Sequence, residues 1–255
     1  MFQIICKSND SLNYYPDNKA NNFRVKILPL ANKGYNNLEV GLVEIIIPCK
    51  IRNVRNGYNS IEITRIDALD AVVKYHIEPG SYSLTSLINE INQQIKSEKL
   101  IKFELNKKTN QAWIVKQQGL PILPFIEIRL GVDIAKILGF CSCEWIVLRT
   151  EQMPSSYQFG PQQDLSMLHV YSNVVKESHM GEFTHQLMRI VNWNQSGKDP
   201  NSIAIVYDRP YFIPVKHMNI DSIHIEIKDN LNIPVEFFYE DEPVIAILEF
   251  QEKKL

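Results

Sequence analysis

Most apolar residues of this chain recur at every second position, the spacing that places alternate side chains on opposite faces of a β-strand. Segment 23–27 (FRVKI) alternates apolar and charged residues, and segment 38–42 (LEVGL) repeats the pattern after a Gly-containing turn. The strand continues into an uninterrupted apolar run, 45–47, before Pro48. Because proline cannot donate to a ladder, we expect this strand to end there, and we expect it to be central and buried on both faces.

The C-terminal half carries further strand patterns at short, regular spacing with turn residues between them. They are MLHVYSNVV (167–175), QLMRIV (186–191), SIAIVY (202–207), SIHIEIKD (222–229), PVEFFY (234–239) and VIAILEFQEK (244–253). Such spacing is typical of a sandwich or barrel rather than of alternating strand and helix units. The polar, Asn-rich segment before FRVKI reads as an N-terminal arm outside the sheet, which makes FRVKI the first long strand.

Residues 55–150 depart from this pattern. Apolar residues of SLTSLINEINQQI fall at helical spacing over 84–95, with Ser83 or Thr85 available as the N-cap. A short second helix is expected at DIAKILG, with Asp133 as N-cap and Gly139 as its end. Two hairpins are expected around them: IEITRI with VVKYHI, and IKFEL with AWIVK across NKKTNQ. We therefore predict an inserted small α+β subdomain over 55–150, and one β-domain formed by 1–54 and 151–255.

Composition narrows the function classes. The net charge is −2 with charges of both signs interspersed, so we expect no specific nucleic acid partner. The basic cluster 50–55 (KIRNVR) is read as a solvated strand end or a subunit-interface charge set, with a local phosphate contact as the weaker alternative. No segment has the length of a transmembrane helix, and the N-terminus lacks a secretory pattern, so we expect neither a transmembrane segment nor signal-peptide secretion.

Candidate chemistry is sparse. His224 and Glu226 share one strand face, which could begin a His-plus-carboxylate iron site, but Ile223, Ile225 and Ile227 form a core stripe opposite and favour a merely exposed polar face. Cys141 or Cys143 could meet His169 or His185 as a thiol nucleophile, yet the flank LGFCSCEW is apolar and favours buried, inert thiols. The acidic run 240–242 (EDE) fits a solvated turn better than a glycosidase pair. We predict no catalytic, metal or cofactor-binding residues.

Aromatic residues leave two interpretations open. They could line a carbohydrate groove, or fill the core and anchor a subunit contact, which is the commoner use of such residues. The candidates are Tyr14, Tyr15, Tyr58, Tyr82, Trp113, Trp145, Tyr157, Trp193, Tyr207, Tyr211 and Phe212.

Several blocks, taken in order, resemble the minor capsid (penton) proteins of Polinton/Maverick elements and related virophages and adintoviruses. YYPDNKANNFRVKI followed by LEVGLVEIIIP resembles that family's F-R-V strand and E-V-G-L strand. IEPGSYSLTSLINEIN and KILGF resemble its P-G-x-Y segment with a short helix and its L-G-F stop. LHVYSNVVKESHMGEFTHQLMRIV resembles two later strands with a Gly-centred link, and YFIPVKHMNIDSIHIEIKDNLNIPVEFFYEDEPVIAILEFQEK resembles the closing strands. Leu38, Met188 and Glu182 depart from the family's usual residues.

The resemblance implies a mainly β fold, a single jelly-roll antiparallel β-sandwich, and no enzymatic activity. It implies a structural protein of the virion that is made in the host cell. Homopentamers would occupy the fivefold vertices of a capsid whose faces consist of a double jelly-roll major capsid protein, with a receptor or glycan as a further partner at the vertex. The alternative is a carbohydrate- or receptor-binding β-sandwich module. The expected core includes alternate strand residues, namely Phe23, Val25, Val40, Leu42, Val170, Ile223, Ile225 and Phe250.

Overall fold

A computed structural model describes residues 1–29, 37–65, 72–97, 99–117, 126–141, 144–157, 167–192, 202–217, 219–230, 232–238 and 242–253. Contacts divide the chain into two compact units, Met1–Ile51 with Leu165–Leu255, and Arg52–Asp164. The sequence set the corresponding limits at 54/55 and 150/151. The second limit differs because the strand β10 (Gln152–Pro154) pairs with a strand of the second unit.

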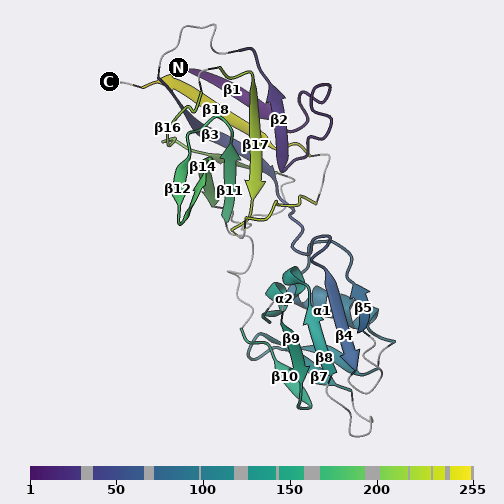
Figure 1. Ribbon diagram of the computed structural model, residues 1–255. Coiled ribbons are helices and arrows are strands. Elements are labelled where there is room, and N and C mark those ends of the chain that lie inside the picture. The colour runs from purple at the N-terminus through teal and green to yellow at the C-terminus, as the bar shows by residue number, and fades with distance from the viewer. Residues whose placement is uncertain are drawn as a thin grey trace. The chain divides into compact units, whose positions relative to one another are not determined.

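The first unit consists of two antiparallel sheets with a shared core (Figure 1). One sheet has the order β1 (Phe2–Lys7), β18 (Ile245–Glu252), β3 (Leu38–Pro48) and β15 (Ser202–Val206), with β16 (Ile213–Pro214) also on β3. The other has the order β14 (Leu187–Asn192), β11 (Met167–Ser172), β17 (Ser222–Lys228) and β2 (Asn22–Lys26). A small hairpin, β12 (Ser178–Met180) with β13 (Phe183–His185), precedes β14.

This strand order is that of a jelly roll. When its long strands are counted along the chain, one sheet contains the first, eighth, third and sixth, and the other the fifth, fourth, seventh and second. Every core residue expected from the alternation is buried, including Phe23, Val40 and Phe250, which have no exposed surface. The fold class predicted from sequence is therefore confirmed.

Strand β3 is central, as expected, but its apolar run is not buried on both faces. Ile45 and Ile47 are buried, whereas Ile46 is only half-buried. The register with β18 shifts so that no residue of β18 lies opposite Val43, which makes Val43 the extra residue of a β-bulge. The bulge moves the buried positions from even to odd numbers, so Ile45 and Ile47 face the core and Ile46 faces outward.

Two strand assignments from sequence are wrong. FRVKI is not the first strand, because residues 2–7 form β1, which pairs with β18 along its length. The described part of PVEFFY, residues 234–238, forms no strand and makes isolated bridges at Pro234 and Phe237. Its apolar side chains instead close the core, since Val235 and Phe237 are buried there.

The second unit has a separate core between two sheets and two helices. One sheet has the order β5 (Val72–His76), β4 (Ser60–Arg65), β8 (Ile126–Leu130) and β9 (Trp145–Leu148), and the other has the order β10, β7 (Gln111–Lys116) and β6 (Ile101–Asn106). Both predicted hairpins are present, as β4 with β5 and β6 with β7. The helices are α1 (Leu84–Gln94) and α2 (Val132–Leu138). Among the described residues, no helix has the length and apolar character needed to cross a membrane.

The helix ends are only partly as predicted. Ser83 caps α1, and its side chain accepts a hydrogen bond from the Ser86 amide. Helix α2 ends at Gly139, whose φ of 78° is the left-handed conformation expected of a C-terminal glycine. Asp133, however, lies inside α2, and the N-cap is Gly131. The Asp133 side chain is used for a buried ion pair instead.

Candidate functional site

The polar segment before FRVKI is folded over the outer edge of β2. Pairing with β17 uses the backbone of alternate residues, since the Ile27 amide donates to Asp221 and the Asn21 carbonyl accepts from Ile227. The amides of the intervening residues, Asn22, Arg24 and Lys26, therefore point to the edge. Unpaired edge groups of this kind are a site where another chain can add a strand.

All three of these amides have partners within the segment. The Arg24 amide donates to Asn18 Oδ1 at 2.8 Å, while Asn18 Nδ2 donates back to the Arg24 carbonyl at 2.9 Å. The Asn22 amide donates to the Lys19 carbonyl, and the Lys26 amide donates to Ser11 Oγ at 3.0 Å. The Asn18 side chain thus makes the two hydrogen bonds to Arg24 that the backbone of a neighbouring strand would make. We call residues 8–21 the edge guard of β2.

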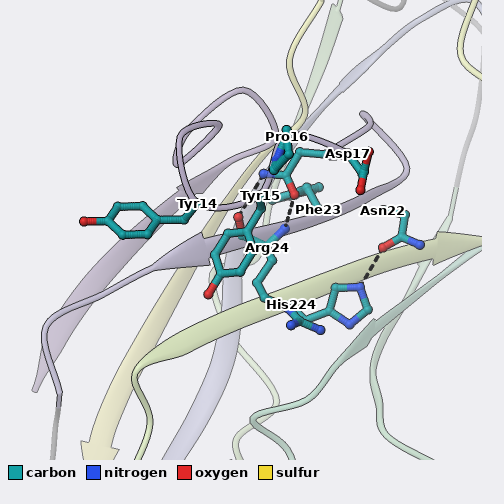
Figure 2. A pocket seen from close by; sticks show the side chains of 9 residues that line it. Tyr14, Tyr15, Pro16, Asp17, Asn22, Phe23, Arg24 and His224 are labelled. Atoms are coloured by element: carbon teal, nitrogen blue, oxygen red, sulfur yellow. Dashed lines mark hydrogen bonds between the residues drawn. The ribbon is translucent and has the colours of Figure 1, made fainter.

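A cavity of about 350 Å³ lies between the edge guard and the strands beneath it (Figure 2). Its lining residues are Tyr14, Tyr15, Pro16, Asp17, Asn18, Asn22, Phe23, Arg24 and His224. The Arg24 guanidinium lies 5.5 Å from the centre of the Tyr15 ring, a cation–π distance. His224 Nε2 lies 2.6 Å from Asn22 Oδ1, a contact drawn in Figure 2.

The electrostatics of this cavity favour a neutral histidine. Burial lowers the pKa of His224, and the nearby Arg24 charge lowers it further. Tyr14, Tyr15 and His224 were candidates from the sequence, whereas Asn22 and Arg24 were not. The density of asparagines before FRVKI was the available signal, because Asn side chains commonly bond to neighbouring backbone.

The metal hypothesis finds no support in the geometry. His224 contacts an amide oxygen, and Glu226 lies 3.0 Å from the Lys228 ammonium group. Among the described residues, no group of three or more His, Cys, Asp or Glu side chains could hold a metal ion.

The thiol interpretation needs correction. Cys141 is exposed, not buried, because Phe140 occupies the core position after α2. Cys143 and most of the EDE run lie outside the described residues. Cys141 belongs to the second unit, whereas His169 and His185 belong to the first. A different thiol, Cys6 of β1, is fully buried, and burial raises its pKa to about 12.

The basic cluster 50–55 also differs from expectation at its last residue. Arg55 is buried and forms a two-pronged ion pair with Asp133, with Nε 2.9 Å and Nη2 2.6 Å from the carboxylate oxygens. The Arg55 amide donates to the same carboxylate at 2.9 Å. This residue therefore joins the start of the second unit to α2 and is neither solvated nor available to a phosphate.

The remaining aromatic candidates are dispersed. Tyr207 lies under the Arg189 guanidinium, 4.0 Å from the ring centre. Tyr58 is 5.2 Å from Arg55, and the Trp113 side chain is half-buried on β7. Trp193 lies outside the described residues. Of the aromatic candidates that the structure describes, Tyr14 and Tyr15 alone line the cavity beside β2.

No family model and no curated protein matches the sequence. A crystal structure of the selenomethionine-labelled mavirus penton protein is similar to this chain, with a TM-score of 0.47 and 11% identical residues. The similarity covers 99% of this chain and 98% of that one.

Proposed function

We propose that this chain is a structural capsid protein, a penton that assembles as a homopentamer at the fivefold vertices of an icosahedral virion. Its neighbours there would be copies of a double jelly-roll major capsid protein. One observation carries the proposal. The penton-like sequence blocks follow one another along the chain in the order expected of that family, and the strands of the first unit are arranged as a jelly roll.

Each block coincides with a structural element. F-R-V lies in β2 and E-V-G-L in β3, and the P-G-x-Y segment leads into α1. The L-G-F block ends α2 at Gly139. V-Y lies in β11, and the Gly-centred link is the turn at Gly181, with φ of 63°, between β12 and β13. Short antiparallel strands in two layers suit a shell subunit, because their edges and loops remain available to neighbours.

Electron microscopy of the purified protein tests this function directly. We expect negative-stain images to show closed rings with fivefold symmetry, and native mass spectrometry to give a species of five copies. Mixing with the major capsid protein should place these rings at vertices. A protein that remains monomeric at high concentration, with and without the major capsid protein, would overturn the proposal.

A second candidate, a carbohydrate-binding module, has one observation in its favour. The Tyr14 ring is 69% exposed at the mouth of the cavity that also presents Asn22 and Arg24. An aromatic face beside polar groups suits a sugar ring. Binding on a glycan array that disappears in Tyr14→Ala but persists in Tyr211→Ala, an equally exposed tyrosine outside the cavity, would establish it. No binding by the unmodified protein would dismiss it.

A further inference from the structure

The two sheets of the jelly roll differ in whether the outward backbone groups of their edge strands have hydrogen-bond partners. The β2 edge of one sheet is closed by the edge guard. The β1 edge of the other sheet is open: the Ser8 amide donates to Val244, so even-numbered residues of β1 pair with β18 and the odd ones point outward. Among the described residues, the backbone amides of Gln3, Ile5 and Lys7 have no hydrogen-bond partner, although the Lys7 carbonyl accepts from the Asp10 amide.

The opposite edge of that sheet, β15, is open in the same sense. The Tyr207 amide donates to the Val43 carbonyl, so Ile205 and Ile203 pair with β3, while Ala204 and Val206 direct their backbone groups outward. Within the described part of the chain these outward amides also lack a partner. A sheet can continue from copy to copy only if both of its edges are open. As far as the described residues go, the sheet of β1 and β15 meets this condition, and the sheet closed at β2 does not.

The most exposed apolar side chains of this sheet lie at its two edges. Ile5 of β1 is 53% exposed and Val206 of β15 is 58% exposed. Both point away from the core and occupy one cross-strand row, because Ile5 lies opposite Ile247, Ile247 opposite Glu44, and Glu44 opposite Val206. A head-to-tail contact would bury both side chains against each other.

Strand directions permit this contact. Neighbouring strands of the sheet are antiparallel throughout, so β1 and β15 run in opposite directions. Rotation about an axis along the strands keeps these directions, and β15 of the next copy therefore meets β1 antiparallel. We propose that β1 of one copy pairs with β15 of the next, with Ile5 opposite Val206, as the repeated contact of the ring. This pairing presupposes the proposed oligomer and assigns its interface.

The register satisfies several independent conditions. Ile5 and Val206 both carry outward amides, so they form the kind of pair that exchanges two hydrogen bonds, about 5.5 Å apart between Cα atoms. Gln3 then lies opposite Asp208 and Lys7 opposite Ala204, with no like charges facing each other. The contact is heterologous, so it can close into a ring.

Cysteine cross-linking tests the register. The expected Cα distance falls within the range of about 4.4–6.8 Å that a disulfide accepts. In a background with Cys49, Cys141 and Cys143 changed to serine, the Ile5→Cys/Val206→Cys protein should form a ladder of covalent species that ends at the pentamer on a non-reducing gel. Each single variant should stay uncross-linked, and an equimolar mixture of the two should stop at the dimer.

The outcomes separate this inference from the proposed function. Fivefold rings without cross-links would overturn the β1–β15 pairing and leave the penton function standing. Dimers from Ile5→Cys alone would also overturn the pairing, because they indicate that β1 pairs with itself. A ladder that continues beyond five copies would support the pairing and overturn the pentamer. Monomers without cross-links would overturn both.

A charge substitution provides a second measurement. Val206→Lys should raise the protein concentration needed for ring assembly at least tenfold. It should leave the thermal unfolding midpoint unchanged, because the side chain is exposed within one subunit. Ile190→Lys is the matched control, a 44% exposed residue of β14 in the other sheet, and should assemble normally. Equal loss of assembly in both variants, or in neither, would contradict the pairing.

Discussion

The buried ion pair between Arg55 and Asp133 allows a quantitative prediction for the second unit. The side chains are only 5% and 3% exposed, and the carboxylate accepts from Nε, Nη2 and the backbone amide of Arg55. Asp133→Asn keeps the shape but removes the negative charge that the buried guanidinium contacts. Removing one partner of such a pair costs about 3–5 kcal/mol, which we expect to be lost from the free energy of unfolding.

The assay should report the second unit alone. In a Trp193→Phe background, the remaining tryptophans, Trp113 and Trp145, belong to that unit, so their fluorescence follows its unfolding in urea. With a slope of about 2 kcal/mol per molar urea, the expected loss lowers the midpoint by about 2 M. The double variant Arg55→Met/Asp133→Asn should lose less than the sum of the two single variants, because both substitutions remove the same interaction.

An exposed pair in the same unit is the control. Lys74 lies 3.0 Å from Glu62, but the lysine side chain is 49% exposed. Lys74→Met should therefore cost less than about 1 kcal/mol. The reasoning is refuted if Asp133→Asn costs no more than Lys74→Met, or if the double variant shows simple additivity of the two single losses.

Three further predictions test separate features. Gly139→Ala should lower the thermal unfolding midpoint of the second unit more than Gly57→Ala does. Both glycines have positive φ, but a Cβ at Gly139 would lie 2.4 Å from the Tyr157 carbonyl oxygen, whereas one at Gly57 would meet nothing within 4 Å. Equal losses would contradict this. Iodoacetamide at pH 8 should label Cys141 and spare Cys6 by peptide mass spectrometry, because burial raises the pKa of Cys6, and rapid labelling of Cys6 would show that β1 is open. The lowered pKa of His224 means that folding favours its neutral form. Its contribution to stability is therefore present above the unfolded-state pKa of about 6.5 and is lost as the pH falls below that value. His224→Gln should flatten this pH dependence of the free energy of unfolding in urea, and an unchanged dependence would argue against it.

Period-two patterning was sufficient to predict most of the jelly-roll strands. It worked for β2, β17 and β18 because each has one face on the core and one toward solvent, which is the condition that imprints alternation on a sequence. It failed for β1, whose outward Ile5 breaks the alternation, and for PVEFFY, whose apolar residues serve the core without a ladder. The bulge at Val43 was not predicted either, because it changes only the phase of the alternation.

The cavity beside β2 was only partly predictable. Tyr14 and Tyr15 stood out as aromatic residues in a polar segment, and His224 as a histidine on an outward strand face. Arg24 did not stand out, because alternating charged residues are normal on a solvated strand. Its position depends on the hydrogen bonds from Asn18, a residue six positions away whose side chain takes the place of a strand.

The sequence by itself determined the mainly β character, the two core stripes, the helix over 84–94 and the order of the penton-like blocks, because these follow from the periodicity and types of nearby residues. Only the tertiary structure decided which strand edges are closed and which remain open. That choice depends on contacts between residues far apart in sequence, such as Ile5, Ile247, Glu44 and Val206 in one row. No local pattern encodes this row, because each strand's register is set by its neighbours and by a bulge.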